Sequence, residues 1–258
     1  MKKAFFLWLF IAITFSAFSQ GKTLYSIASV KPKAGMKMAF EAAWKTHLDK
    51  YHVKEEDRQA VYEITTGVHA GTYMIVTGPM SYADMDIEKA NRKEHGADLQ
   101  STISGLLESN VQSWYRWDDT ASYHGDVVAS KFNVQVTHIK WGMQIATIRE
   151  SKRGSQINQK LYPTDRFSFN VYVQQFAGSD PVIVNVRNLK DGFKEMENGY
   201  YGPNPMANQP DAFKNAYIAQ YGQADWDARQ KLVMDNANVA SREAYLMVLR
   251  KDLSTPVK

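Results

Sequence analysis

The sequence predicts an α+β fold in which one β-α-β-β-α-β unit occurs twice in tandem. The first observation is a hairpin pattern at residues 60–77, where two β-rich runs flank a turn that contains glycine. The second is its recurrence at residues 171–186, since both copies open with Val-Tyr and Val61 and Val171 are 110 positions apart. The third is an echo of Asn110-Val111 in Asn238-Val239, ahead of the last predicted strand of each copy.

The first unit begins with a predicted strand at residues 23–31, which Pro32 and Gly35 end. An amphipathic helix is expected at residues 36–51, because large side chains recur at helical spacing on one face. These side chains are Phe40, Trp44, His47, Leu48 and Tyr51. The hairpin supplies the next two strands.

A second helix is expected to begin at Ser81, where Asp84 three positions later completes the pattern of a capping box, and to weaken at Gly96. A further helical run at residues 99–110 and a strand at 111–117 complete the unit. The order of elements is that of a ferredoxin-like unit, which we place at residues 23–118.

A linker at residues 119–132 leads to the second ferredoxin-like unit, at residues 133–253. Its elements are predicted as a strand at 138–148, a short helix at 149–161, the second hairpin, helices at 212–221 and 224–236, and a strand at 241–250. The second copy is 18 residues longer between hairpin and last strand. The extra length falls in a loop at residues 199–211, which is rich in Gly, Pro and Asn.

Helices cover one face of each predicted sheet, and packing the two bare faces together would bury both. Through VYEITTG…TYMIVTGPMSYADM and VYVQQFAG…VIVNVRNLKDGFKEM, the chain resembles the dimeric α/β-barrel superfamily, here as a tandem that forms the barrel within one chain. That superfamily includes antibiotic-biosynthesis-type monooxygenases, haem-degrading enzymes and proteins with no known activity. The resemblance implies that ligands lie between a sheet and its helices or inside the barrel.

The first nineteen residues have the pattern of a secretory signal peptide. Two lysines precede an apolar run from Ala4 to Phe18, and Ala17-Phe18-Ser19 predicts cleavage before Gln20. We therefore expect an exported protein, periplasmic or secreted, that has no membrane segment after cleavage. The alternative is a retained N-terminal anchor.

Composition excludes several classes of function. The chain of 258 residues has no cysteine, so no disulfide or thiolate nucleophile is available. A net charge of +4 without a lysine or arginine block argues against nucleic-acid binding. Nucleotide-binding, hydrolase and zinc-protease motifs are absent. We expect a monomer or a weak homo-oligomer that binds a small molecule.

Two histidines are candidates for contact with a bound ligand or haem. His47 lies on the apolar face of the first helix. It would either contact a bound haem or small aromatic molecule, or be a core histidine with one satisfied partner. His95 lies on the helix where, by the resemblance, haem-degrading members place their iron ligand; otherwise it is a solvated residue at a helix end. The strand at residues 25–30 lacks the asparagine that accompanies that ligand. Because no two histidines have metal-ligand spacing along the chain, the sequence predicts no metal and no cofactor, with haem as the alternative.

Strand alternation suggests a second kind of site. If the valine faces of the second hairpin meet the helices, polar side chains line the barrel interior and can bind an oxygen-rich or anionic molecule. The predicted ligand-binding residues are Tyr172, Gln174, Asn185, Arg187, Tyr245 and His95. A buried polar network that only fixes the pairing of the two units is the alternative.

Three functions follow as hypotheses. The first is an exported protein that binds a small molecule in the barrel or in a pocket between sheet and helices. The second, from the resemblance, is a cofactor-independent monooxygenase-like or haem-handling enzyme. The third is a protein that binds a partner through the loop at residues 199–211.

Overall fold

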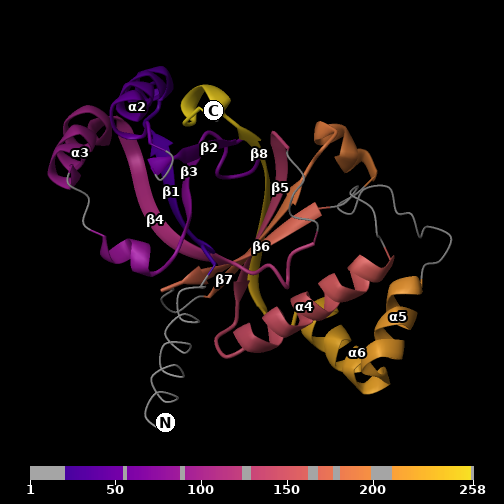
Figure 1. Ribbon diagram of the computed structural model, residues 1–258. Helices are drawn as coiled ribbons and strands as arrows, with labels where there is room; N and C mark the ends of the chain where they lie inside the picture. The colour runs from indigo at the N-terminus through magenta and orange to yellow at the C-terminus, as the bar shows by residue number, and fades with distance from the viewer. Residues whose placement is uncertain are drawn as a thin grey trace, which may run out of the picture.

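A closed barrel of antiparallel strands forms the centre of the molecule (Figure 1). The computed structural model describes residues 21–54, 57–87, 91–123, 129–161, 168–176, 181–198 and 211–256. The strands are β1 (Leu24–Pro32), β2 (Gln59–Ile64), β3 (Tyr73–Met80), β4 (Leu107–Trp117), β5 (Lys131–Ile139), β6 (Ser168–Gln175), β7 (Val182–Asn188) and β8 (Val239–Leu249). The helices are α2 (Lys37–Tyr51), α3 (Arg92–Asp98), α4 (Gln144–Leu161), α5 (Ala212–Tyr221) and α6 (Gln223–Arg229).

The strand order around the barrel is β1-β3-β2-β8-β5-β7-β6-β4. The first half of the barrel is therefore β4-β1-β3-β2, and the second half has the same arrangement, β8-β5-β7-β6. Pairing of β2 with β8 closes one junction, at Tyr62–Leu249, and pairing of β4 with β6 closes the other, at Trp117–Tyr172. Helices α2 and α3 lie outside the first half, and α4, α5 and α6 lie outside the second (Figure 1). The predicted α+β class and barrel are confirmed.

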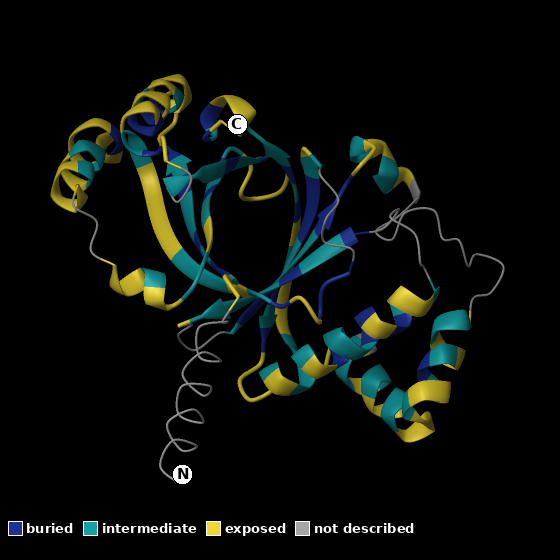
Figure 2. Cartoon of the chain, in the orientation of Figure 1, coloured by how far each residue is buried: buried dark blue, intermediate teal, exposed yellow. Residues whose placement is uncertain are grey.

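An apolar cluster lies inside the barrel, where β2 of the first half meets β8 and β5 of the second. Ile64 of β2 packs with Phe132 and Val134 of β5 and with Tyr245 and Met247 of β8. Strand alternation turns the other face of each strand outward, toward the helices. Exposed residues lie on the helices, in the loops and along the first part of β4 (Figure 2).

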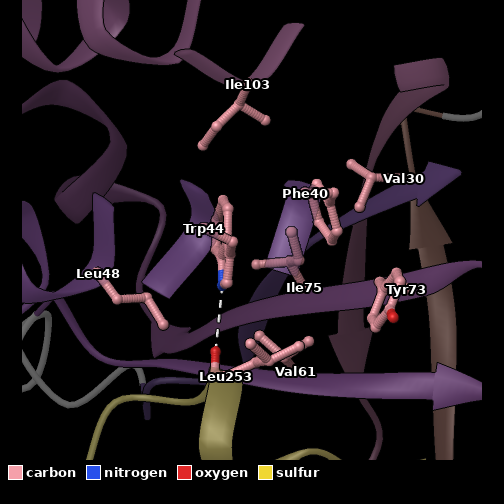
Figure 3. Packing of buried hydrophobic residues seen from close by; sticks show 9 residues of the cluster. All are labelled: Val30, Phe40, Trp44, Leu48, Val61, Tyr73, Ile75, Ile103 and Leu253. Carbon is pink, nitrogen blue, oxygen red and sulfur yellow. Dashed lines mark hydrogen bonds between the residues drawn. The ribbon is translucent and has the colours of Figure 1, made fainter. Parts of the chain in front are cut away.

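A second core lies between the sheet of the first half and its helices, around Trp44 (Figure 3). Phe40, Trp44 and Leu48 of α2 are buried on the face that the sequence predicts, against Val61 and Ile75 of the sheet. The indole nitrogen of Trp44 donates to the carbonyl of Leu253 at 3.1 Å. The segment after β8 therefore closes the core of the first half.

Three predicted elements differ from the structure. The strand expected at residues 138–148 is wrong, because β5 ends at Ile139 and α4 begins at Gln144. Between them Met143 N–H donates to the carbonyl of Lys140 at 3.0 Å, and Gly142 takes φ +82° in this turn. The β-branched residues after the turn, which suggested a strand, belong to the helix.

The helical run expected at residues 99–110 ends at Leu106, and its last residues belong to β4. The capping box is confirmed by Ser81 N–H donating to Asp84 Oδ2 at 2.8 Å and Asp84 N–H donating to Ser81 Oγ at 3.2 Å. It precedes only a 3₁₀ turn, Ala83–Asp86, and α3 forms separately. Gly96 lies inside α3 rather than at its end.

Two predicted segments lie outside the described residues: the signal peptide at 1–19 and all but Asp211 of the loop at 199–211. In the described part of the chain, no helix combines the length and the apolar character that crossing a membrane requires.

Candidate functional site

Three histidine side chains converge beside α2 in the first half. His47 belongs to α2, His52 follows the end of that helix, and His95 belongs to α3. The Nε2 atom of His95 lies 3.0 Å from Nε2 of His47 and 3.2 Å from Nε2 of His52. His47 and His52 are buried and His95 is half-buried, so the three imidazoles form one largely enclosed cluster.

The other ring nitrogens of His47 and His52 have acceptors that fix their orientation. His47 Nδ1 lies 2.7 Å from Asp98 Oδ2, and His52 Nδ1 lies 2.8 Å from the carbonyl oxygen of Asp57. A carbonyl or carboxylate oxygen only accepts, so each Nδ1 carries the proton and donates. In the neutral rings each Nε2 therefore presents a lone pair toward His95.

Ionisation follows from burial and charge around the cluster. Burial lowers the pKa of His52 from 6.5 to about 4, so this ring is neutral at neutral pH. The hydrogen bond from His47, and a second from Lys50 at 3.1 Å, hold the pKa of Asp98 below its usual value. Asp98 is thus a carboxylate that accepts from His47.

The cluster lies on the wall of a cavity of about 340 Å³ between the sheet and the helices of the first half. Trp44 and Phe40 form part of its apolar wall, while Gln59, Asn110 and Gln112 contribute amide groups. Among the described residues that line it, none is Asp, Glu, Lys or Arg. This cavity is where a ligand would meet the imidazoles.

A cavity of about 190 Å³ occupies the corresponding place in the second half, between α4, α6 and the sheet. Its described lining contains no histidine; instead the buried carboxylate of Glu150 contacts Arg153 at 3.1 Å and accepts from the Tyr217 hydroxyl at 2.5 Å. Arg229 Nη1 also lies 3.6 Å from Glu150. Ion pairs occupy the place that imidazoles hold in the first half.

The structure divides the predicted ligand-binding residues among three places. His95 lies in the histidine cluster. Tyr172 and Tyr245 face the barrel interior, where Tyr172 meets the ring of Tyr25 edge-on at 5.5 Å between centroids, and Gln174 shares the face of Tyr172 by alternation. Burial raises the pKa of Tyr172 and of Tyr245.

The placement of Asn185 and Arg187 inside the barrel is wrong. Asn185 lines the cavity beside α4, and Arg187 is 1% exposed and pairs with Glu195 at 3.1 Å, outside the barrel. The physical reason is that the valine face of β7 packs inside the barrel, with Val184 and Val186 beside Tyr245. The opposite face must then meet the helices.

Sequence reasoning missed His52 and Asp98 entirely. It also compared histidines by spacing along the chain, and 43 positions separate His52 from His95. His69 lies in the turn between β2 and β3, away from the cluster, and pairs with Glu243. The available signal was that His47 and His52 lie at the end of one helix and His95 on the other helix of the same unit. Two helices that cover one sheet face can bring such residues together.

Comparison with known proteins identifies the fold. No protein-family model matches the chain, and no curated protein matches it in sequence. Among solved structures, an anthrone oxidase-like protein is similar over 90% of this chain and 92% of its own, with a TM-score of 0.51 and 12% identity. A mutant chlorite dismutase from Candidatus Nitrospira defluvii, in complex with cyanide, is similar over 91% and 93%, with a TM-score of 0.51 and 9% identity. The chain has the dimeric α/β-barrel fold, as the sequence resemblance indicates.

Proposed function

We propose that this chain is an enzyme that binds a small molecule in the cavity of the first half and acts on it through His47, His52 and His95. One observation carries the proposal: three imidazoles converge on the wall of a cavity. Nε2 of His95 lies 3.0 Å from that of His47 and 3.2 Å from that of His52. Neutral imidazole serves as a general base or as a metal ligand. A purely structural histidine needs only one satisfied partner, whereas the Nε2 atoms of these three lie within hydrogen-bonding distance through His95.

The cavity lining favours an uncharged ligand or one whose charge the cluster neutralises, since its described residues contribute no ionised side chain other than histidine. Gln59 adds a specific group. Its amide nitrogen donates to Thr77 Oγ1 at 3.2 Å, while its buried Oε1 has no hydrogen-bond partner within the described residues. A ligand with an O–H or N–H group would supply that partner.

The fold supports an enzyme without naming its reaction. Two solved proteins of similar fold are described as an anthrone oxidase-like protein and a chlorite dismutase, so this barrel accommodates oxidative chemistry elsewhere. The monooxygenase-like alternative is consistent with these neighbours. The barrel interior is a weaker candidate for the site, because the three histidines line the cavity outside it and Ile64, Phe132 and Met247 form an apolar cluster on its β2-β8-β5 side.

We further propose that the barrel arose as a tandem of two ferredoxin-like units. Asn110 and Asn238, the echoed residues, line the two corresponding cavities. Tyr62 and Tyr172 occupy corresponding strands at the two junctions. The helices α3 and α6 both continue into π-helical turns, Leu99–Ile103 and Gln230–Met234. Among the described residues, histidines line the cavity of the first unit and not that of the second, so the two units would have diverged in function.

Export remains part of the proposal, and its support is the signal-like pattern of residues 1–19. The predicted partners also remain: a small molecule and no nucleic acid, with the chain a monomer or weak homo-oligomer. Binding of a partner through the loop at 199–211 stays a separate hypothesis.

A ligand screen tests the proposed function. Ligand-observed NMR with a library of small uncharged compounds should find binders whose contacts map to the first cavity. His95→Ala should weaken them, whereas His69→Ala, at an exposed histidine that pairs with Glu243, should not. Binders that are equally affected by both substitutions, or that map to the barrel interior, would contradict the proposal.

A further inference from the structure

We propose that His47, His52 and His95 together bind a divalent first-row transition-metal ion. This inference deepens the proposed function, because the ion would lie on the wall of the same cavity and form its reactive centre. It is tested separately, since metal binding can be measured without any substrate. Among the described residues, these three histidines are the group whose ligand atoms gather closely enough to hold an ion, all within 4.8 Å of one another.

The spacing of the ligand atoms suits a metal. Imidazole nitrogens bind Zn²⁺ at about 2.0–2.1 Å, so two of them at a tetrahedral angle are separated by about 3.3 Å, and at a right angle by about 2.9 Å. The observed Nε2 separations from His95, 3.0 and 3.2 Å, lie between these limits. Rotation of the rings would bring the three ligand atoms, which lie within 4.8 Å of one another, into contact with one ion.

The positions of the ring protons also favour a metal ion at this cluster. The backbone carbonyl of Asp57 accepts from Nδ1 of His52 at 2.8 Å, so Nε2 of the neutral His52 ring only accepts. His95 Nε2 can carry one proton, and that proton can satisfy His47 or His52 well, but not both. The Nε2 lone pair of the other histidine is then left without a donor, although it lies only 3.0 or 3.2 Å from His95 Nε2. A cation shared by the three Nε2 atoms, with the His95 proton on Nδ1, would use all three lone pairs.

The groups behind the histidines are those that accompany metal ligands. A metal-bound histidine usually donates its other N–H to a carboxylate or a backbone carbonyl, which fixes the ring and raises its basicity. His47 donates to the Asp98 carboxylate and His52 to the carbonyl of Asp57.

The arrangement has the character of a catalytic rather than a structural centre. Structural zinc sites supply four protein ligands, whereas catalytic sites supply three and leave a position for water or substrate. Asp98 is not a fourth ligand, since its two oxygens accept from His47 and Lys50. The remaining position faces the cavity, where a bound water would have a lowered pKa.

A bare ion fits these residues better than haem. Haem bound through His95 would place its porphyrin around the iron, in the plane perpendicular to the Fe–Nε2 bond. The imidazoles of His47 and His52 lie within 3.2 Å of that same nitrogen, where the porphyrin would have to pass. Binding of haem iron by His95, which the sequence resemblance implies, would therefore require the imidazoles of His47 and His52 to move away from His95 Nε2.

Metal titration of the tag-free mature chain tests this inference. After removal of metals with a chelator, Co²⁺ should bind at one equivalent per chain and give the visible d–d absorption of a low-symmetry site, and Zn²⁺ should displace it. His95→Ala should lower the Co²⁺ affinity at least about 100-fold, since it removes one of three ligands. His69→Ala provides the matched control and should leave the affinity unchanged.

Substitution of a half-buried histidine can disturb folding, so near-UV circular dichroism accompanies each titration and His95→Gln serves as a second variant. A folded wild-type protein that binds no Co²⁺ or Zn²⁺ at micromolar concentration would overturn the inference. So would affinity that is equal in folded wild type and His95 variants. A haem titration runs in parallel: a stoichiometric Soret shift that depends on His95, without Co²⁺ binding, would also overturn it. Loss of the metal site with retained small-molecule binding would leave the proposed binding cavity standing.

Discussion

The contact between Asp98 and His47 predicts how strongly the metal is held. Replacing Asp98 by Asn keeps the size of the side chain and an oxygen that can accept from His47 Nδ1, but removes the negative charge. At present the carboxylate accepts at 2.7 Å from His47. Without its charge, His47 becomes a less basic ligand, and metal affinity falls.

The expected magnitude is at the low end of the usual range. Removing a partner behind a metal ligand typically weakens binding about 10–100-fold. Lys50 already contacts the other oxygen of Asp98 at 3.1 Å and neutralises part of its charge. We therefore expect a loss of about tenfold in Co²⁺ affinity.

Competition between the protein and a chromophoric chelator for Co²⁺ measures this change. Asp49→Asn is the matched control, because Asp49 is exposed on α2, the helix that carries His47, and its substitution removes the same charge. If the two substitutions weaken binding equally, the effect is one of net charge and the orienting role of Asp98 is refuted. Unchanged affinity in Asp98→Asn would refute it as well.

Three further predictions concern stability and are all measured by urea denaturation. Glu150→Ala should destabilise the second half by about 3–5 kcal/mol, because Glu150 is 2% exposed and Arg229 and Arg153 lose their buried counter-charge; a loss below about 1 kcal/mol would contradict this. Phe40→Ala should cost about 3–5 kcal/mol, since Phe40 is fully buried in the core around Trp44, and a change typical of surface positions would show that this core is not as described. The hydrogen bond with Arg250 is the main cause that holds the pKa of Glu41 below 4.5 in the folded protein. Ionised Glu41 therefore stabilises the fold above pH 4.5, and this contribution is lost as the pH falls through the folded-state pKa. Glu41→Gln should therefore make the acid side of the stability profile less steep, and an unchanged slope would contradict the assignment.

Local patterns in the sequence predict the architecture well. The spacing of Phe40, Trp44 and Leu48 identifies the buried face of α2, because an apolar stripe at that spacing has to cover a sheet. The two hairpins appear as β2–β3 and β6–β7. Residues 138–148 were predicted as one strand, but they contain the end of β5, a turn and the start of α4. β-Branched residues occur on both sides of that turn, and its only strong sequence signal is Gly142.

The candidate site depends on tertiary contacts that local patterns do not contain. Alternation separates the faces of β7 correctly but does not say which face is inside. The barrel interior takes the valines, and Arg187 goes to the helix side. His52 follows the end of α2 without any periodic signal, and only the packing of α3 against α2 brings His95 to it. Convergence of side chains distant in sequence is a property of the fold.

X-ray diffraction from crystals grown with Zn²⁺, recorded on both sides of the zinc absorption edge, examines the histidine centre most directly. We predict one strong anomalous peak per chain, about 2.1 Å from the Nε2 atoms of His47, His52 and His95, with a water or ligand facing the cavity. Crystals in which these three imidazoles remain in contact with no anomalous peak between them would contradict the account.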